Sequence, residues 1–307
     1  VFYTPHAVHA DCPGFQLARD LDIPLKGYVY CYPAKSNYLG GDIISGMIDT
    51  ELYKKNEISV FFDIGTNGEL ILGKNDQLYT CSTAAGPAFE GAKISCGMRG
   101  APGAIDHVTI ENGKLKLHVI GDGTPSGICG SGLLDLIACL LDLGIISNRG
   151  RLEKPAKWSD DLKEAYGSRF VTRDNVSALL LTDDENGVYL SQKDIREVQL
   201  AKAALASGIE LLCQEMRVSD ADISQVLLAG AFGTYLSPAS ACRIGLIPET
   251  LLDRIRAIGN AAGEGAKLAA YSQTVLKQSK EFSKRTQFVE LATSKQFQET
   301  YLKRLNF

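Results

Sequence analysis

The sequence has few features of membrane, secreted or nucleic-acid-binding proteins. No apolar run approaches the roughly 20 residues needed to cross a bilayer. Residues 1–6 are not a basic stretch followed by an apolar core, as a signal peptide requires. The 32 Lys and Arg are outnumbered by 36 Asp and Glu, and the net charge of −4 offers no electrostatic footprint for nucleic acid. We therefore predict a cytoplasmic protein that binds neither membranes nor nucleic acids.

The eight cysteines lack the spacing of a metal site. None are spaced C-x2-C or C-x4-C, the local spacings expected of zinc and iron–sulfur sites. Several lie in apolar or glycine-rich runs, where Cys behaves as a small hydrophobic residue. We predict reduced thiols, and we expect that none of the eight ligates a metal ion.

Length and composition are those of an ordinary globular protein. The chain has 307 residues, of which 45% are hydrophobic and 22% charged. This length fits one large domain or two lobes. The chain begins without Met and in the middle of a pattern, so we expect a fragment of a longer protein.

One stretch organises the chain, a predicted hairpin with a turn at residues 65–68. The apolar runs 58–64 and 70–72 flank Gly65-Thr66-Asn67-Gly68. Apolar runs with β-branched and aromatic residues around a Gly/Asn turn predict a β-hairpin. An ordinary Asn-Gly hairpin is one interpretation, and a ligand-binding turn is the other.

The turn carries groups that suit a phosphate. Gly65 and Gly68 allow backbone N–H groups to approach a ligand closely, and successive N–H groups form an anion-binding concavity. Thr66 and Asn67 add side-chain donors. Asp63, at the end of the strand, can hold a hydrated metal ion beside the phosphate.

Hydrophobic periodicity and turn residues predict the remaining elements. A capping box at Ser191 and Asp194 is expected to open the longest helix. The glycine-rich loop 121–132 before a helix is a weak signal of an anion site, and Ser131 is expected instead to be a simple N-cap. Residues 149–187, which are charged and irregular, are expected to form an exposed or mobile excursion. The predicted strands are 28–32, 77–81, 108–110, 115–120, 226–229 and 254–258, and the predicted helices are 42–53, 133–143, 191–216 and one last helical region from 260 to 305.

Two further segments are candidate ligand contacts. Arg99 is the lone cation in a small, neutral stretch, 95–106, and it is either a solvated surface charge or a contact to a phosphate or an acidic partner. Gly230-Ala231-Phe232-Gly233 follows a buried strand. Such a turn can lay backbone against a flat ring, or it is a plain connection from strand to helix.

Together these segments resemble a known superfamily. The Asp63–Glu69 hairpin, a run of small residues, a long helix and residues 227–233 resemble the second lobe of the ASKHA superfamily, which contains sugar kinases, actin and heat-shock chaperones. The resemblance is closer to the C-terminal ASKHA domain of the reductive activators of corrinoid proteins. It rests on residues 81–92, 97–99, 127–132 and 194–202.

The resemblance implies an α/β fold, an actin-like or RNase H-like ASKHA lobe with a mixed sheet flanked by helices. Residues 1–57 would be the end of the first lobe and the crossover helix, and residues 58–307 the second lobe. The implied activity is that of an ATPase that returns Co(II) corrinoid proteins to Co(I) for methyl transfer. Its partner would be a corrinoid iron–sulfur protein or a corrinoid methyltransferase subunit, and a homodimer is expected.

The resemblance also assigns site residues. ATP would bind with its phosphates at Gly65, Thr66, Asn67 and Gly68 and its adenosine at Gly230, Ala231, Phe232 and Gly233. Asp63 and Glu69 would be the catalytic carboxylates, with Asp63 holding Mg²⁺ through water. Arg99 would contact a phosphate or the partner.

Two departures from the family pattern matter. Family members carry an N-terminal ferredoxin-like domain with a [2Fe-2S] cluster, so we expect that cluster only in a domain that this sequence lacks. ASKHA proteins also clamp the nucleotide between two Asp-x-Gly-Thr hairpins, and only Asp63–Glu69 is present. We therefore expect the isolated chain to be inactive. Ala231 replaces a commoner glycine of the adenosine turn.

Two other functions stay open from the sequence. A sugar or acyl kinase would need a carboxylate aimed at a hydroxyl substrate. A non-catalytic module would serve dimerisation or partner docking.

Overall fold

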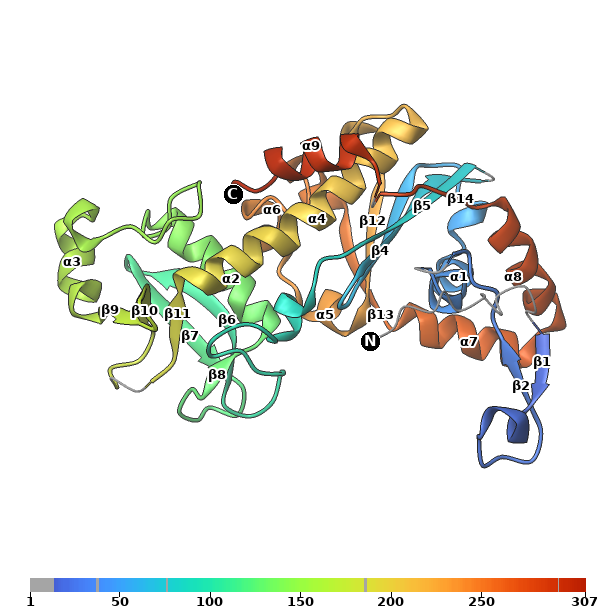
Figure 1. Ribbon diagram of the computed structural model, residues 1–307, viewed down its shortest axis with the longest axis horizontal. Helices are drawn as coiled ribbons and strands as arrows, with labels where there is room; N and C mark the ends of the chain where they lie inside the picture. The colour runs from blue at the N-terminus through green and yellow to red at the C-terminus, as the bar shows by residue number, and fades with distance from the viewer. Residues whose placement is uncertain (1–13, 37–38, 76, 185–186, 292) are drawn as a thin grey trace.

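A six-stranded mixed sheet forms the centre of the molecule in the computed structural model, which describes residues 14–36, 39–75, 77–184, 187–291 and 293–307 (Figure 1). The strand order is β13-β12-β3-β4-β5-β14. Its strands are β3 (Ser59–Ile64), β4 (Gly68–Lys74), β5 (Gln77–Thr83), β12 (Gln225–Ala229), β13 (Ile255–Gly259) and β14 (Gln287–Phe288). The prediction of one mixed sheet is confirmed.

Strand β3 connects the two halves of this sheet. It pairs antiparallel with β4 and parallel with β12. Both of its faces are covered, because Phe61 lies in one hydrophobic core and Phe62 in the other. This double burial explains why β3 is a continuous apolar run.

Helices cover both faces of the sheet (Figure 1). One layer contains α1 (Gly41–Thr50), α7 (Ala261–Tyr271) and α8 (Gln273–Arg285). The other contains α4 (Gln192–Met216), against which α9 (Lys295–Lys303) packs. The predicted capping box of α4 is confirmed, since Ser191 and Asp194 bond each other's backbone N–H.

A long insertion separates β5 from α4 and forms a second body of structure (Figure 1). One small sheet has the order β7-β6-β8 and another the order β11-β10-β9. The elements are β6 (Ala104–Glu111), β7 (Lys114–Val119), β8 (Gly127–Ile128), α2 (Gly130–Asp142), α3 (Asp160–Tyr166), β9 (Phe170–Arg173), β10 (Val176–Leu180) and β11 (Tyr189–Ser191).

Two predictions made from the sequence are wrong here. The charged segment 149–187 is not an exposed excursion, because it contains α3, β9 and β10, and Trp158, Tyr166 and Leu179 are buried. The C-terminal region is not one helical run. Ser272 and Ser294 each accept a hydrogen bond at the start of a new helix, and N-caps of this kind begin separate helices.

The remaining elements are a two-stranded ribbon and two short helices. A two-stranded ribbon pairs β1 (Gly14–Leu17) with β2 (Tyr28–Cys31). Helices α5 (Gly230–Tyr235) and α6 (Pro238–Arg243) follow β12. Within the part of the chain that the structure describes, no helix has both the length and the apolar character that a membrane span requires.

Candidate functional site

A pocket of about 690 Å³ lies where the central sheet meets the insertion. This volume is within the range of small-molecule sites. The central body contributes Asp63, Ile64, Gly65, Gly230, Phe232 and Tyr235. The segment after β5 and the insertion contribute Phe89, Glu90, Met98, Arg99, Gly100, Asp106, Ile120, Cys129, Gly130 and Ser131. Five residues predicted as site residues, Asp63, Gly65, Arg99, Gly230 and Phe232, thus line one pocket.

The arrangement of the parallel strands β3 and β12 explains part of this convergence. Ala229 is the register partner of Asp63, so Gly230 follows directly beside that carboxylate. A Cβ atom on Gly230 would lie 2.6 Å from Asp63 Oδ1. Ligands of open α/β sheets bind at the carboxyl ends of strands, and the pocket is at such an edge.

The phosphate turn has one residue in the pocket lining and two exposed residues beside it. Gly65 is half-buried and its N–H donates to the carbonyl of Asn67 at 2.9 Å. Thr66 is exposed, and its hydroxyl donates to the Glu90 carboxylate. Gly68, by contrast, is buried and packs against α4, where a Cβ atom on residue 68 would lie 2.0 Å from the Leu205 side chain. Close packing accounts for that glycine.

The predicted adenosine turn is the first turn of α5. Gly230 has φ +86°, a left-handed conformation that favours glycine. The ring of Phe232 stacks on Phe89 with centroids 5.3 Å apart. Gly233 is buried against β12, since a Cβ atom there would lie 3.3 Å from the carbonyl carbon of Leu228. Ala231 lies on the same turn of α5.

Asp63 and Glu69 are register partners on neighbouring strands, so their side chains share one face of the sheet. Burial, and then the negative charge of Asp42 on α1, raises the pKa of Asp63. The same two causes, with the charge of Asp63 added, raise the pKa of Glu69 to about 7. Ser82 donates to Glu69 at 3.4 Å. Glu69 is not among the residues that line the pocket.

Three lining residues, Glu90, Asp106 and Tyr235, were not predicted from the sequence. Glu90 and Asp106 reach the pocket only because the segment after β5 and the insertion fold back on the sheet, which no local pattern shows, and Tyr235 follows the predicted turn 230–233 at the end of α5. The glycine-rich loop before α2 gave only a weak signal in the sequence, and the structure places Gly130 and Ser131 in the pocket lining. The prediction that Ser131 is an N-cap is wrong. Cys129 is the N-cap, and Ser131 Oγ donates to the carbonyl of Asp106 at 2.9 Å.

The residues present fit a magnesium–nucleotide complex better than a protein-built metal site. The described residues hold no group of three or more His, Cys, Asp or Glu side chains that could bind a metal ion. Mg²⁺ commonly keeps several waters and uses one or two carboxylates with substrate phosphates. Asp63 in the pocket wall, beside Gly65, meets that requirement.

The sheet order, the helical layers and the inserted body with a pocket against the sheet are those of an ASKHA domain. A family model described as the C-terminal domain of RACo, the ASKHA domain, matches residues 57–307. The chain belongs to this family. The family resemblance predicted from the sequence is therefore confirmed.

Curated relatives agree with this assignment. The chain is 38% identical over 294 residues to the corrinoid activation enzyme RamQ of Eubacterium limosum. This alignment covers 92% of this chain and 49% of RamQ. It is 27% identical over 304 residues to the [Co(II) methylated amine-specific corrinoid protein] reductase of Methanosarcina barkeri. That alignment covers 90% of this chain and 51% of the reductase. The chain thus spans about half the length of the curated relatives it matches.

A solved structure gives the same result. A reductive activator for corrinoid, iron–sulfur protein superposes with a TM-score of 0.85 at 33% sequence identity. The match covers 95% of this chain and 47% of that chain. It supports the mixed α/β fold across both the central sheet and the insertion.

Proposed function

We propose that this chain is the nucleotide-binding portion of an ATP-dependent reductive activator, which returns Co(II) corrinoid proteins to Co(I) for methyl transfer. One observation carries the nucleotide part of the proposal: Asp63, Gly65, Gly230 and Phe232, separated in sequence, line one pocket of nucleotide size. The names of the relatives support the corrinoid part.

Roles follow from position. The phosphates would lie at the turn of Gly65, Thr66 and Asn67, where the Asn67 side-chain amide is a donor. The Thr66 hydroxyl would have to exchange its bond to Glu90 for a phosphate oxygen, and the Gly65 N–H already donates to the Asn67 carbonyl. Asp63 would hold Mg²⁺ through water, and the ion would supply charge neutralisation at the phosphates. Burial raises the pKa of Glu69 to about 7, so it can accept a proton near neutral pH; from its place beside Asp63, outside the pocket lining, it would act as the second carboxylate. The turn at 230–233 holds the adenosine.

The complete activator would contain more than this chain. Residues 1–57 would be the end of a first lobe and the crossover helix, and residues 58–307 the second lobe. A [2Fe-2S] cluster in a further N-terminal domain would supply the electron. The partner would be a corrinoid iron–sulfur protein or a corrinoid methyltransferase subunit, and the activator would be a homodimer.

A titration with Mg-ATP tests the nucleotide site. Phosphoryl chemistry depends on positioning and on neutralised charge, and the second hairpin that would close over the phosphates is not part of this chain. We expect a dissociation constant no better than about 1 mM, or roughly −4 kcal/mol, and no turnover. The titration is followed by NMR, with shifts expected near Gly65 and Gly230.

Either of two results would contradict this. Absence of binding at tens of millimolar would remove the nucleotide site. A micromolar constant, or turnover abolished by Asp63→Ala, would instead show that this chain contains a complete phosphate clamp.

Arg99 gives a second test. It is exposed and is the one Lys or Arg among the described residues that line the pocket. Arg99→Ala should weaken binding of the nucleotide or of the corrinoid protein by about 1–3 kcal/mol, because charge-assisted hydrogen bonds are lost. Arg256→Ala removes one exposed cation of β13 outside the pocket lining and is the control. If Arg99→Ala binds both the nucleotide and the corrinoid protein as tightly as the wild type does, Arg99 is only a solvated surface charge.

A further inference from the structure

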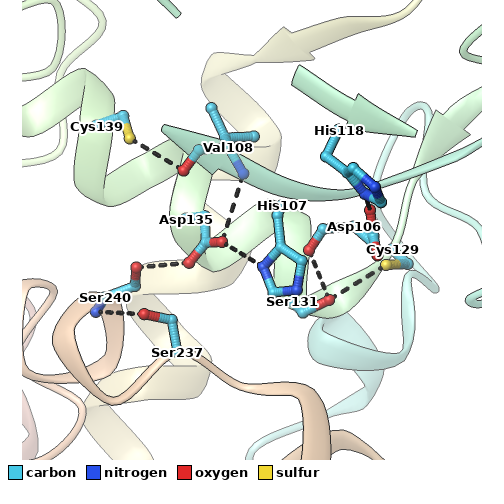
Figure 2. Close-up of polar contacts among 10 residues, drawn as sticks. All are labelled: Asp106, His107, Val108, His118, Cys129, Ser131, Asp135, Cys139, Ser237 and Ser240. Carbon is cyan, nitrogen blue, oxygen red and sulfur yellow. Dashed lines mark hydrogen bonds and ion pairs between the residues drawn. The ribbon is translucent and has the colours of Figure 1, made fainter. Parts of the chain in front are cut away.

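The insertion places one carboxylate in the pocket that the proposed phosphate and adenosine turns do not use. Asp106, on β6, lines the pocket, and its side chain is 19% exposed. Its Oδ1 atom lies 2.5 Å from His118 Nδ1 (Figure 2). This hydrogen bond raises the pKa of His118. Within the described residues no hydrogen bond is made by Asp106 Oδ2, which therefore remains available to a ligand.

A β-bulge aims this side chain. The register of β6 against β7 shifts between Ile105 and His107, which leaves Asp106 as the extra residue of the bulge. Bulges occur next to active sites, where they redirect a side chain. Figure 2 shows the result, because Asp106 turns to His118 whereas His107 turns to Asp135, with Nδ1 and Oδ2 3.0 Å apart.

The backbone at the bulge is held as well. Ser131 Oγ, at the start of α2, donates to the carbonyl of Asp106 at 2.9 Å (Figure 2). Gly132 brings α2 close, since a Cβ atom there would lie 3.1 Å from Asp106 Cα. Both Ser131 and Asp106 line the pocket. The carboxylate is thus held at its side chain, its main chain and the adjoining helix.

We propose that Asp106 selects the nucleoside part of the ligand, by accepting a hydrogen bond from a ribose hydroxyl or from the amino group of adenine. This inference rests on the proposed nucleotide site. A carboxylate is an acceptor only, so it pairs with a donor group of the ligand. A site built to bond such a donor discriminates against an analogue that lacks it, because the buried acceptor is then left unpaired.

The competing explanation is that Asp106 only pairs with His118 to stabilise the hairpin of β6 and β7. The two explanations differ in what a substitution changes. A purely structural aspartate affects unfolding and leaves the relative affinities of nucleotides as they were. A selecting aspartate changes those relative affinities.

The experiment compares four Mg-nucleotides on the same chain by NMR-monitored titration: ATP, 2′-deoxy-ATP, 3′-deoxy-ATP and the purine riboside triphosphate without the 6-amino group. In the wild type, we expect at least one analogue to bind about tenfold more weakly than ATP. The analogue affected shows which donor Asp106 pairs with. In Asp106→Ala, the affinity for ATP should fall about tenfold. The affinities for ATP and for that analogue should then differ by no more than about twofold.

Two further variants make the result decisive. Asp122→Asn removes a nearby negative charge at an exposed turn outside the pocket lining, and it should keep the wild-type discrimination. Asp106→Leu has a side chain of similar size without an acceptor atom, and it replaces Asp106→Ala if thermal unfolding shows that the alanine variant is not folded.

The outcomes separate the two proposals. If the wild type binds no nucleotide, the proposed nucleotide site is wrong and the role of Asp106 falls with it. If the wild type binds all four equally, or if the Asp106 variants keep the wild-type discrimination, nucleotide binding stands and the selecting role of Asp106 is overturned.

Discussion

Asp194→Ala should lower the free energy of unfolding by about 3–5 kcal/mol. The Asp194 side chain is 1% exposed. Its Oδ2 atom accepts from the N–H and hydroxyl of Ser191 at 2.8 and 2.7 Å, and its Oδ1 atom accepts from the N–H and hydroxyl of Ser95 at 2.7 and 3.0 Å. Four donors would lose a charged acceptor. The two donors of Ser191 are buried, so they carry a desolvation penalty when unpaired, and the two of exposed Ser95 lose their bond to α4.

The chain contains a matched control for this prediction. Asp222 makes the same local contacts with Ser219, at 2.8 Å to both the N–H and the hydroxyl. It is exposed, however, and among the described residues it has no hydrogen bond to a distant segment. Asp222→Ala should cost about 0.5–1 kcal/mol, as an exposed cap does. Urea unfolding of both variants measures the difference. Equal costs would show that the bonds to Ser95 contribute nothing.

The position of Asp194 connects stability to the candidate site. Ser95 begins the segment that carries Met98 and Arg99 into the pocket, and Asp194 fastens that segment to the start of α4. Hydrogen exchange of residues 95–100 should therefore be faster in Asp194→Ala, because their anchor to the helix is lost.

The central sheet was predictable because its signals are local. The apolar runs of β3, β4 and β12 and the turn at 65–68 are visible in short windows. The capping box of Ser191 and Asp194 is likewise a pattern of four residues. Once β3 and β12 are assigned to one parallel pair, the proximity of Asp63 and Gly230 follows from the topology alone.

The insertion was less predictable because long-range contacts determine it. Residues 149–187 were predicted to be exposed from their charges, yet a few buried side chains such as Trp158 and Leu179 are enough to build a core. Gly68 has the sequence context of a phosphate-binding glycine, and only the approach of Leu205 shows that packing requires it. Asp106 enters the pocket through a bulge whose register no sequence window contains.

Gly230→Ala should lower the free energy of unfolding by about 2–4 kcal/mol and abolish detectable nucleotide binding. Two effects add. A φ of +86° is unfavourable for a residue with a Cβ atom and costs about 1–3 kcal/mol. The new methyl group would also lie 2.6 Å from Asp63 Oδ1 and 3.1 Å from the carbonyl oxygen of Ile64, so the end of β3 must move.

Gly144→Ala separates these two effects. Gly144 has φ +71°, but a Cβ atom there would meet nothing within 4 Å. Its cost should be near 1 kcal/mol, the backbone contribution alone. The excess cost of Gly230→Ala then measures the collision at the strand end.

A double-mutant cycle identifies the collision partner. If the methyl group at position 230 displaces the carboxylate of Asp63, then Gly230→Ala should cost less in an Asp63→Ala background by about 1 kcal/mol or more. Thermal or urea unfolding of the four proteins measures this coupling. Additive costs would mean that the strain is taken up by the backbone at Ile64. Because Asp63 is the proposed magnesium-holding residue, a positive coupling would also show that Gly230 keeps that carboxylate in its place in the pocket wall.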